Sequence, residues 1–253
     1  MTPDWSELDR ELAHWQAAGK TLPLWWRDDD AMAQSAELDR LAALSEKLDL
    51  PVHLAVIPQG ATPDLARFTR ENPQLIPVVH GWAHQNHAPA GEKKAEFGAH
   101  RPLDMLLEEA ERGLGCLREL FGPSLRPMFV PPWNRMDARM LPWLAGAGYT
   151  AVSAFTPRSA AKPAPGLLRV NTHLDPIAWR AGRSLLPPAE LIRQAARQLR
   201  DRRLGEADSG EPYGILTHHL AQDDAVWEFT EALAARLLAG PGEAWVYDER
   251  MSA

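Results

Sequence analysis

The order of strand-like and helix-like segments predicts a (β/α) barrel for this chain of 253 residues. Two observations predict it: short apolar runs alternate with amphipathic stretches, and polar side chains directly follow several of the apolar runs. Such alternation is typical of parallel strands joined by helices, and about 250 residues is the usual length of such a barrel. A doubly wound open sheet is the alternative, although no glycine-rich phosphate-binding fingerprint follows the first strand.

The sequence of the first half predicts helices and strands in alternation. Residues 1–20 carry apolar side chains at helical spacing after Thr2, a predicted N-cap, and we expect a helix that packs on the barrel. Leu22 to Trp26 is a short apolar run that stops at Arg27 and three aspartates, which predicts a buried strand ending in a polar loop. The next expected elements are a helix capped by Ser35, a strand at 52–57, a helix starting at Thr62 and a strand at 76–79.

The second half continues the pattern after a long polar loop at 81–98. The expected helices cover 102–121, 137–147, 188–203 and 224–238. The expected strands cover 128–130, 149–153, 167–170, 213–217 and 244–247. At this length one large barrel is admissible, and we expect residues 1–253 to form a single domain.

Composition narrows the class of protein. Hydrophobic residues make up 45% and charged residues 24%, the usual balance of a globular chain. The net charge of −7, with no long basic tract, argues against a nucleic-acid partner. Cys116 is the only cysteine, which excludes an intrachain disulfide and a cysteine-based metal cluster. No apolar stretch predicts a membrane span and the first twenty residues lack a signal-peptide core, so we expect a cytoplasmic protein of undetermined oligomeric state.

Side chains capable of chemistry follow the predicted strands. In a parallel barrel these strand ends share one rim, where active sites are built, so residues distant in sequence can converge there. They are Asp28 to Asp30, His80 and His84, Pro132 to Asn134, Asp175, and His218 with His219.

His80 and His84 are four residues apart, and a helical turn after the strand would let both imidazoles face one ion. His87 is a further candidate ligand that we expect to stay at the rim. The three consecutive aspartates repel one another unless a cation or hydrogen-bond donors neutralise them. They either form an acidic turn before Ser35, or supply one metal ligand and one free carboxylate that acts as a base. One aspartate and two histidines leave positions on an ion for water and substrate.

Strand alternation separates the two histidines that follow residues 213–217. Leu216 and His218 should lie on one face, with Thr217 and His219 on the other, so only one imidazole should enter the site. A histidine there can protonate a leaving group, because its ordinary pKa of about 6.5 lies near working pH.

Together, these segments resemble the polysaccharide deacetylase family, also called the NodB-homology family or carbohydrate esterase family 4, over residues 22–220. The Ala31 that follows the aspartates stands where the family usually has glycine, which favours Asp29–Asp30 as the family's acidic pair over Asp28–Asp29. The other matching segments are His80 with His84, Val130 to Asn134, Asp175 with Trp179, and Leu216 to His218.

The resemblance implies a distorted (β/α)7–8 barrel and a metal-dependent hydrolase that removes the acetyl group from an N-acetylated sugar. Asp29 would be the base, His218 the acid and Asp175 the partner that orients His218. Asp30, His80 and His84 would bind a divalent ion, Zn²⁺ first and Co²⁺, Ni²⁺ or Mn²⁺ as alternatives. The implied substrate-binding residues are Pro132, Trp133, Asn134 and Leu216.

One departure from the family pattern concerns the base. Val130 stands where the family has an arginine that positions the base, and Arg27 or Arg135 are the candidates to replace it. Two other functions stay open on the same fold: hydrolysis of another C–N bond, such as that of a small cyclic amide, and a catalytically silent carbohydrate- or metal-binding module. We expect the loops at 81–98 and 154–166 to shape the cleft.

Overall fold

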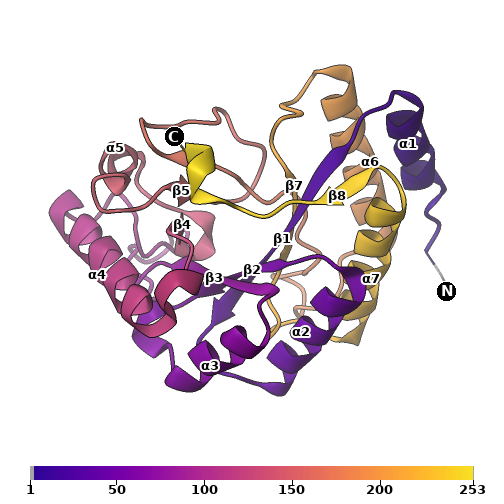
Figure 1. The fold of residues 1–253 in the computed structure, drawn as a ribbon. Helices are drawn as coiled ribbons and strands as arrows, with labels where there is room; N and C mark the ends of the chain where they lie inside the picture. The colour runs from indigo at the N-terminus through magenta and orange to yellow at the C-terminus, as the bar shows by residue number, and fades with distance from the viewer. Residues whose placement is uncertain (1–2, 253) are drawn as a thin grey trace.

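A curled, entirely parallel sheet forms the centre of the computed structural model, which describes residues 3–252 (Figure 1). The strand order is β6-β5-β4-β3-β2-β1-β7, and β8 pairs with the start of β1. This confirms the predicted barrel in a distorted form. The strands are β1 (Leu22–Ala31), β2 (Val52–Val56), β3 (Leu75–His80), β4 (Met128–Val130), β5 (Ala151–Val152), β6 (Leu168–Arg169), β7 (Tyr213–Thr217) and β8 (Gly242–Ala244).

The distortion lies between β6 and β7, where single bridges replace regular strand pairing. Thr172 bridges to Phe155 and Leu174 bridges to Ile215, both in the parallel sense. The His173 N–H donates to the Gly214 carbonyl at 2.8 Å. The segment that follows β6 therefore spans the gap to β7.

Helices cover the outer face of the sheet (Figure 1). Side chains cap several of them: Ser35 Oγ accepts from the Leu38 N–H, and Thr62 Oγ1 accepts from the Leu65 N–H. The helices are α1 (Ser6–Ala17), α2 (Ala36–Leu48), α3 (Pro63–Glu71), α4 (Leu103–Phe121), α5 (Leu141–Leu144), α6 (Pro188–Leu204) and α7 (Asp224–Ala239). None of the helices within residues 3–252 has the length and apolar character needed to cross a membrane.

The N-terminal helix packs across α6 and α7. The indole of Trp15 donates to the Leu199 carbonyl of α6 at 3.1 Å, and Trp5 stacks on Phe229 of α7 at 5.3 Å between ring centroids. The helix begins at Ser6, whose N–H donates to the Asp4 carboxylate. Thr2, the predicted N-cap, lies outside the described residues.

Two predicted elements differ in length from the observed ones. The helix expected at 137–147 is a short 3₁₀ turn at Ala138–Met140 followed by the four-residue α5. Pro142 lacks the N–H that would continue a helix through it, and Gly148 leaves the helical conformation with φ +89°. The last strand, β8, covers Gly242–Ala244, whereas the predicted strand covered 244–247. The residues after Ala244 are not part of the sheet.

Alternation along the strands divides the buried side chains into two layers. One layer lies between the sheet and the helices and includes Leu24 and Trp26 of β1. The other fills the barrel interior and includes Trp25 of β1, Ala55, Val78 and Met128. Residues two apart share a face of a strand, so the interior face of β1 carries Trp25, Arg27 and Asp29 in succession.

Aromatic side chains close the amino end of the barrel interior. The run after β8 crosses the barrel toward β5 (Figure 1). There the Trp245 ring lies 5.8 Å from Trp25 and 5.9 Å from His53. The Tyr247 N–H donates to His53 Nε2 at 3.1 Å, and its hydroxyl donates to Thr150 Oγ1 at 2.6 Å. Side chains therefore fill this end of the barrel interior.

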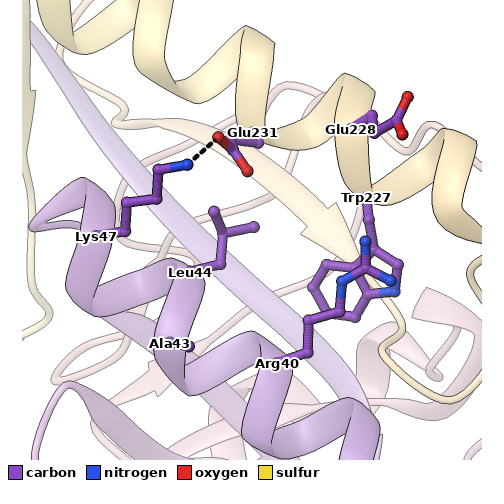
Figure 2. A pocket seen from close by; sticks show the side chains of 7 residues that line it. All are labelled: Arg40, Ala43, Leu44, Lys47, Trp227, Glu228 and Glu231. Carbon is purple, nitrogen blue, oxygen red and sulfur yellow. Dashed lines mark hydrogen bonds and ion pairs between the residues drawn. The ribbon is translucent and has the colours of Figure 1, made fainter.

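A cavity of about 220 Å³ lies on the outside, between α2 and α7 (Figure 2). Lys47 Nζ lies 2.5 Å from the Glu231 carboxylate, and the Arg40 guanidinium lies 4.9 Å from the Trp227 ring centroid. These contacts join the two helices, and the lining contains neither histidine nor cysteine. The convergent polar groups lie instead at the carboxyl ends of the strands.

Candidate metal and catalytic site

Strand β1 continues through the charged residues that were predicted to end it. It runs to Ala31, so Arg27, Asp28 and Asp29 belong to the sheet and are almost fully buried. Buried charges are tolerated only when they are paired and hydrogen-bonded. Each of these three has such partners, which explains why the strand does not stop at Trp26.

Arg27 holds the predicted base. Its Nε and Nη2 donate to the two carboxylate oxygens of Asp29 at 2.8 and 2.9 Å, a bidentate pair. The same guanidinium donates to Ser153 Oγ at 2.7 Å and to Asn134 Oδ1 at 2.6 Å. Of the two candidates to replace the family's arginine, Arg27 is the one in contact with Asp29. Arg135 donates to the Lys94 carbonyl instead.

Asp28 and His219 pair on the outer face of the sheet, away from the interior. Asp28 Oδ1 lies 2.5 Å from His219 Nδ1, and Oδ2 accepts from the Thr217 hydroxyl at 2.6 Å. Burial acts to lower the pKa of His219, and the charge of Asp28 outweighs it, so the net shift is upward. The structure thus places Asp28 and His219 together, and leaves Asp29, Asp30 and His218 for the cavity.

A bulge in β1 aims Asp30 into the site. The pairing with β2 shifts register between Asp28 and Ala31, and Asp30 has a left-handed φ of +75°. In a regular strand Asp30 would share the outer face with Asp28, and bulges redirect side chains in this way. Asp30 Oδ1 consequently lies 3.1 Å from His80 Nε2 and 3.2 Å from His84 Nε2.

The two histidines reach Asp30 by different routes. His80 ends β3 on the interior face, and its Nδ1 lies 3.0 Å from the Val130 carbonyl, which fixes the ring. His84 lies on a loop with left-handed φ values at Gly81 and His84. The helical turn expected between the histidines is therefore absent from this loop, yet their rings approach to 5.1 Å between centroids.

Glu96, which the sequence analysis did not single out, organises this loop. Its carboxylate is fully buried and accepts from the backbone N–H of Ala83 at 2.7 Å and of Trp82 at 3.2 Å. Its only signal in the sequence is an acidic residue between apolar Ala95 and Phe97. The loop takes its shape from a residue twelve positions beyond His84.

The ligand atoms of Asp30, His80 and His84 lie within 4.8 Å of one another. With its Nδ1–H donated to Val130, the His80 ring presents Nε2 to the carboxylate, and a proton or a cation must lie between them. Two imidazole nitrogens and one carboxylate oxygen suit Zn²⁺ and related divalent ions. These residues therefore fit a metal ion, and exposed His87 stays outside the cluster.

The pKa shifts agree with a cation-binding cluster. Burial acts to raise the pKa of Asp30, but the His80 hydrogen bond and the neighbouring imidazoles outweigh it and lower that pKa. Burial likewise acts to lower the pKa of His80, and the carboxylates of Asp29 and Asp30 raise it overall. Burial and the charge of His80 lower the pKa of His84. The carboxylate is thus ionised and favours positive charge beside it.

His218 faces Asp29 from the end of β7. Its Nε2 lies 4.0 Å from Asp29 Oδ2, and Trp179 packs edge-on against the imidazole at 4.6 Å between centroids. Asp175 accepts from the Trp179 indole at 2.7 Å and from the Ile177 N–H at 2.9 Å. Within residues 3–252 no hydrogen bond joins Asp175 to His218, so the expected orienting contact runs through Trp179. Burial raises the pKa of Asp175.

A cavity of about 1230 Å³ opens over these groups. Its lining includes Asp29, Asp30, His80, His84, Asp175 and His218. Of the four predicted substrate-binding residues, Trp133 and Asn134 line it, and Trp133 lies 4.3 Å from the His84 ring. Leu216 and Pro132 are buried and are not part of the lining. The loops predicted to shape the cleft contribute Ala83, Lys93, Lys94 and Phe155.

Strained backbone is concentrated around this cavity. Among the described residues, five of the seven non-glycine residues with positive φ line it: Asp30, His84, Trp133, Asn134 and Arg183. Such conformations persist only where the surrounding structure enforces them, and they cluster at functional sites. Here buried Glu96 and the Arg27 hydrogen bond to Asn134 supply that enforcement.

Comparison with known proteins relates this geometry to solved structures. No protein-family model matches the sequence, and no curated protein matches it. A family 4 carbohydrate esterase from Streptomyces lividans, in complex with acetate, matches with a TM-score of 0.56 and 16% identity over 91% of this chain and 95% of that chain. The chain has the polysaccharide deacetylase fold.

Other solved structures share the polysaccharide deacetylase fold with this chain. A polysaccharide deacetylase from Bacillus cereus matches with a TM-score of 0.50 and 16% identity, over 90% of this chain and 93% of that chain. A mutant of a family 4 pseudoenzyme with restored enzymatic activity matches with a TM-score of 0.56 and 13% identity, over 88% of this chain and 65% of that chain. The resemblance predicted from the five segments is thus confirmed at the level of the fold.

Proposed function

We propose that this protein is a metal-dependent hydrolase that removes the acetyl group from an N-acetylated sugar. The observation that carries the proposal is the convergence of Asp30, His80 and His84 within 4.8 Å, beside an Asp29 carboxylate held by Arg27 outside that cluster. A site of this kind separates the group that holds the ion from the group that moves the proton. The solved structures with the same fold include a family 4 carbohydrate esterase and a polysaccharide deacetylase, which supports the same chemistry.

Asp30, His80 and His84 would hold the ion, with Zn²⁺ first and Co²⁺, Ni²⁺ or Mn²⁺ as alternatives. When bound, a divalent cation polarises an amide carbonyl and lowers the pKa of water. The remaining steps belong to the chain. Asp29 takes the proton from the attacking water, while Arg27 fixes both of its oxygens in the required direction.

His218 faces Asp29 and supplies the proton to the departing amine. Its Nε2 lies 4.0 Å from Asp29 Oδ2, so an amide placed beside the pair can contact both the acid and the base. Trp179, held by Asp175, limits the directions in which the His218 ring can turn. Trp133 packs on His84 and forms an apolar wall for the acetyl group or the sugar ring.

Metal analysis combined with acetate release tests the proposal. We expect about one divalent ion per chain, acetate release from N-acetylated chitooligosaccharides, loss of activity with a chelator and recovery on adding Zn²⁺. The His80→Ala, His84→Ala double variant should neither bind the ion nor release acetate. His87→Ala is the matched control, because His87 is an exposed histidine on the same loop and should behave as wild type.

Full acetate release by the double variant, or in the presence of chelator, would overturn the metal mechanism. Metal binding without hydrolysis of any acetylated sugar would instead favour a silent binding module. Hydrolysis of a cyclic amide, without hydrolysis of the sugars, would instead support an enzyme that cleaves another kind of C–N bond.

A further inference from the structure

Five cationic side chains surround the mouth of the site cavity in a chain whose net charge is −7. All five are exposed, and they are Lys93, Lys94, Arg135, Arg180 and Arg183. The acidic residues of the same lining are Asp29, Asp30 and Asp175, and each is already engaged: by Arg27, by the two histidines and by Trp179. The cavity's own carboxylates therefore do not neutralise its mouth.

The rim cations differ in their partners from several exposed arginines elsewhere on the protein. Several exposed arginines elsewhere lie against carboxylates, as Arg112 does with Glu108 and Arg67 with Asp64, whereas Arg193 and Arg197 of α6 are in no ion pair among the described residues. Within residues 3–252 no ion pair involves any of the five rim cations. Arg135 donates to the Lys94 carbonyl, and the Lys94 ammonium lies 5.9 Å from the Trp133 ring centroid. Their charge is available to a bound molecule.

The cations flank the reacting groups from two sides. On one side Lys94 packs over Trp133, which in turn contacts the metal-ligand candidate His84. On the other side Arg180 follows Trp179, which contacts the candidate acid His218. An amide placed at Asp29 would leave the rest of its molecule between these two groups of cations. The cavity of about 1230 Å³ has room for more than one sugar ring.

Resting on the proposed function, we propose that the substrate is an anionic N-acetylated sugar, one that carries a phosphate or a carboxylate on or next to the ring whose amide is cleaved. Arginine forks and lysine ammonium groups bind both kinds of anion. Cations lining a cleft also raise the local concentration of an anionic substrate and its rate of association. A neutral chitin fragment would leave all five charges without a partner.

Three sugars separate the possibilities: N-acetylglucosamine 1-phosphate, N-acetylmuramic acid, which carries a carboxylate, and neutral N-acetylglucosamine. At low salt we expect kcat/KM of the zinc-loaded protein for at least one anionic sugar to exceed that for the neutral sugar about tenfold or more. The anionic sugar with the higher kcat/KM shows whether phosphate or carboxylate is the group that the protein recognises. The ratio should fall toward one at about 0.5 M NaCl, because salt screens exposed charges.

A charge-removal variant ties the preference to the rim. Replacing Lys93, Lys94, Arg180 and Arg183 by glutamine should reduce the ratio to near one. The matched control is Arg193→Gln with Arg197→Gln, two exposed arginines of α6 outside the cavity lining, which should keep the wild-type ratio. Calorimetric Kd values for the three sugars, measured on chelator-treated protein, give a second readout without turnover and without contact between phosphate and metal.

Equal kcat/KM and equal Kd for charged and neutral sugars would overturn the anionic substrate, as would a preference that survives in the quadruple variant. Absence of acetate release from all three sugars, with tighter binding of an anionic one, would overturn the proposed function while supporting the anion-binding rim.

Discussion

The two ends of the barrel interior contain the same kind of side chain in opposite states. His53 of β2 and His80 of β3 are both buried inside the barrel on adjacent strands. At the amino end, His53 has backbone partners, the Trp26 carbonyl and the Tyr247 N–H, and burial lowers its pKa to about 4. At the carboxyl end, His80 faces Asp29 and Asp30, and its pKa is raised. The partners, rather than burial itself, decide whether the imidazole is neutral or favours positive charge.

The two ends of the barrel interior also differ in packing and in backbone conformation. The amino end is filled by aromatic rings around His53, whereas the carboxyl end carries the left-handed residues Asp30, His84, Trp133 and Asn134. Strained, charged groups can be held only on a rigid support. At the carboxyl end, buried Glu96 and Arg27 supply that support, and four variants test the contrast between the two ends.

Asp29→Asn should produce the largest change. It removes the proposed base, so kcat for acetate release should fall by about 10²- to 10⁴-fold. Asp29 lies outside the metal cluster, so metal content should be unchanged, whereas Asp30→Asn should lose both the ion and activity. Acetate release and metal content are measured on both variants. Loss of the ion in Asp29→Asn would assign Asp29 to the ligands and contradict the division of roles.

Arg27→Met should cost about 3–5 kcal/mol in the free energy of unfolding, because it leaves the Asp29 carboxylate buried without its bidentate partner. Urea unfolding of the metal-free protein measures this. In the Arg27→Met, Asp29→Asn double variant no buried charge is left unpaired, so the loss should be smaller than the sum of the two single losses. Additive losses would mean that the pair contributes little.

Protonation of His53, at the amino end of the barrel, should make the stability of the protein depend on pH. The folded protein keeps His53 neutral down to about pH 4, whereas in the unfolded chain it gains a proton near its ordinary value of 6.5. The unfolded state therefore binds more protons between these values, and stability falls as pH falls from 6.5 to 4, by about 3 kcal/mol for this one group.

His53→Gln keeps a donor and an acceptor but cannot be protonated, so it should flatten the stability profile between pH 6.5 and 4 relative to wild type. His14→Gln, at an exposed position of α1, is the control and should leave the slope as it is. An unchanged slope in His53→Gln would show that another group carries this pH dependence.

Glu96→Gln should give the smallest effect, a loss of metal affinity of about 10- to 100-fold. The glutamine amide can accept fewer of the N–H groups that shape the loop before His84. Competition with a chelator of known affinity measures the change. Glu92→Gln, exposed on the same loop, should bind the ion as wild type does. Equal affinities for both variants would mean that His84 is positioned without Glu96.

The sequence predicted the features that depend on local pattern. Apolar runs marked the strands, and alternation after β7 correctly separated His218 from His219, because strand periodicity is a local property. The polar residues after the strands were rightly expected to converge, since parallel strands bring their carboxyl ends to one rim.

The sequence did not predict features that depend on distant partners. The extension of β1 through Arg27 and Asp28 relies on Ser153 and His219, which are 126 and 191 residues away. The bulge at Asp30 and the loop around Glu96 likewise depend on contacts between segments. Periodicity alone marked the charges after Trp26 as the end of a strand, because the partners that compensate them are invisible to a local pattern.

The pairing of β1 has a consequence for how the chain folds. The first strand is bordered by β2 on one edge and by β7 on the other, and β8 pairs with its beginning. A nascent chain can form the β1–β2–β3 portion early, but the first strand gains its remaining neighbours only when residues 213–244 have been synthesised. Pairings so remote in sequence slow folding, since loop closure must precede the contacts that reward it. The strand that carries Asp29 and Asp30 is therefore synthesised well before the strands that complete its pairing.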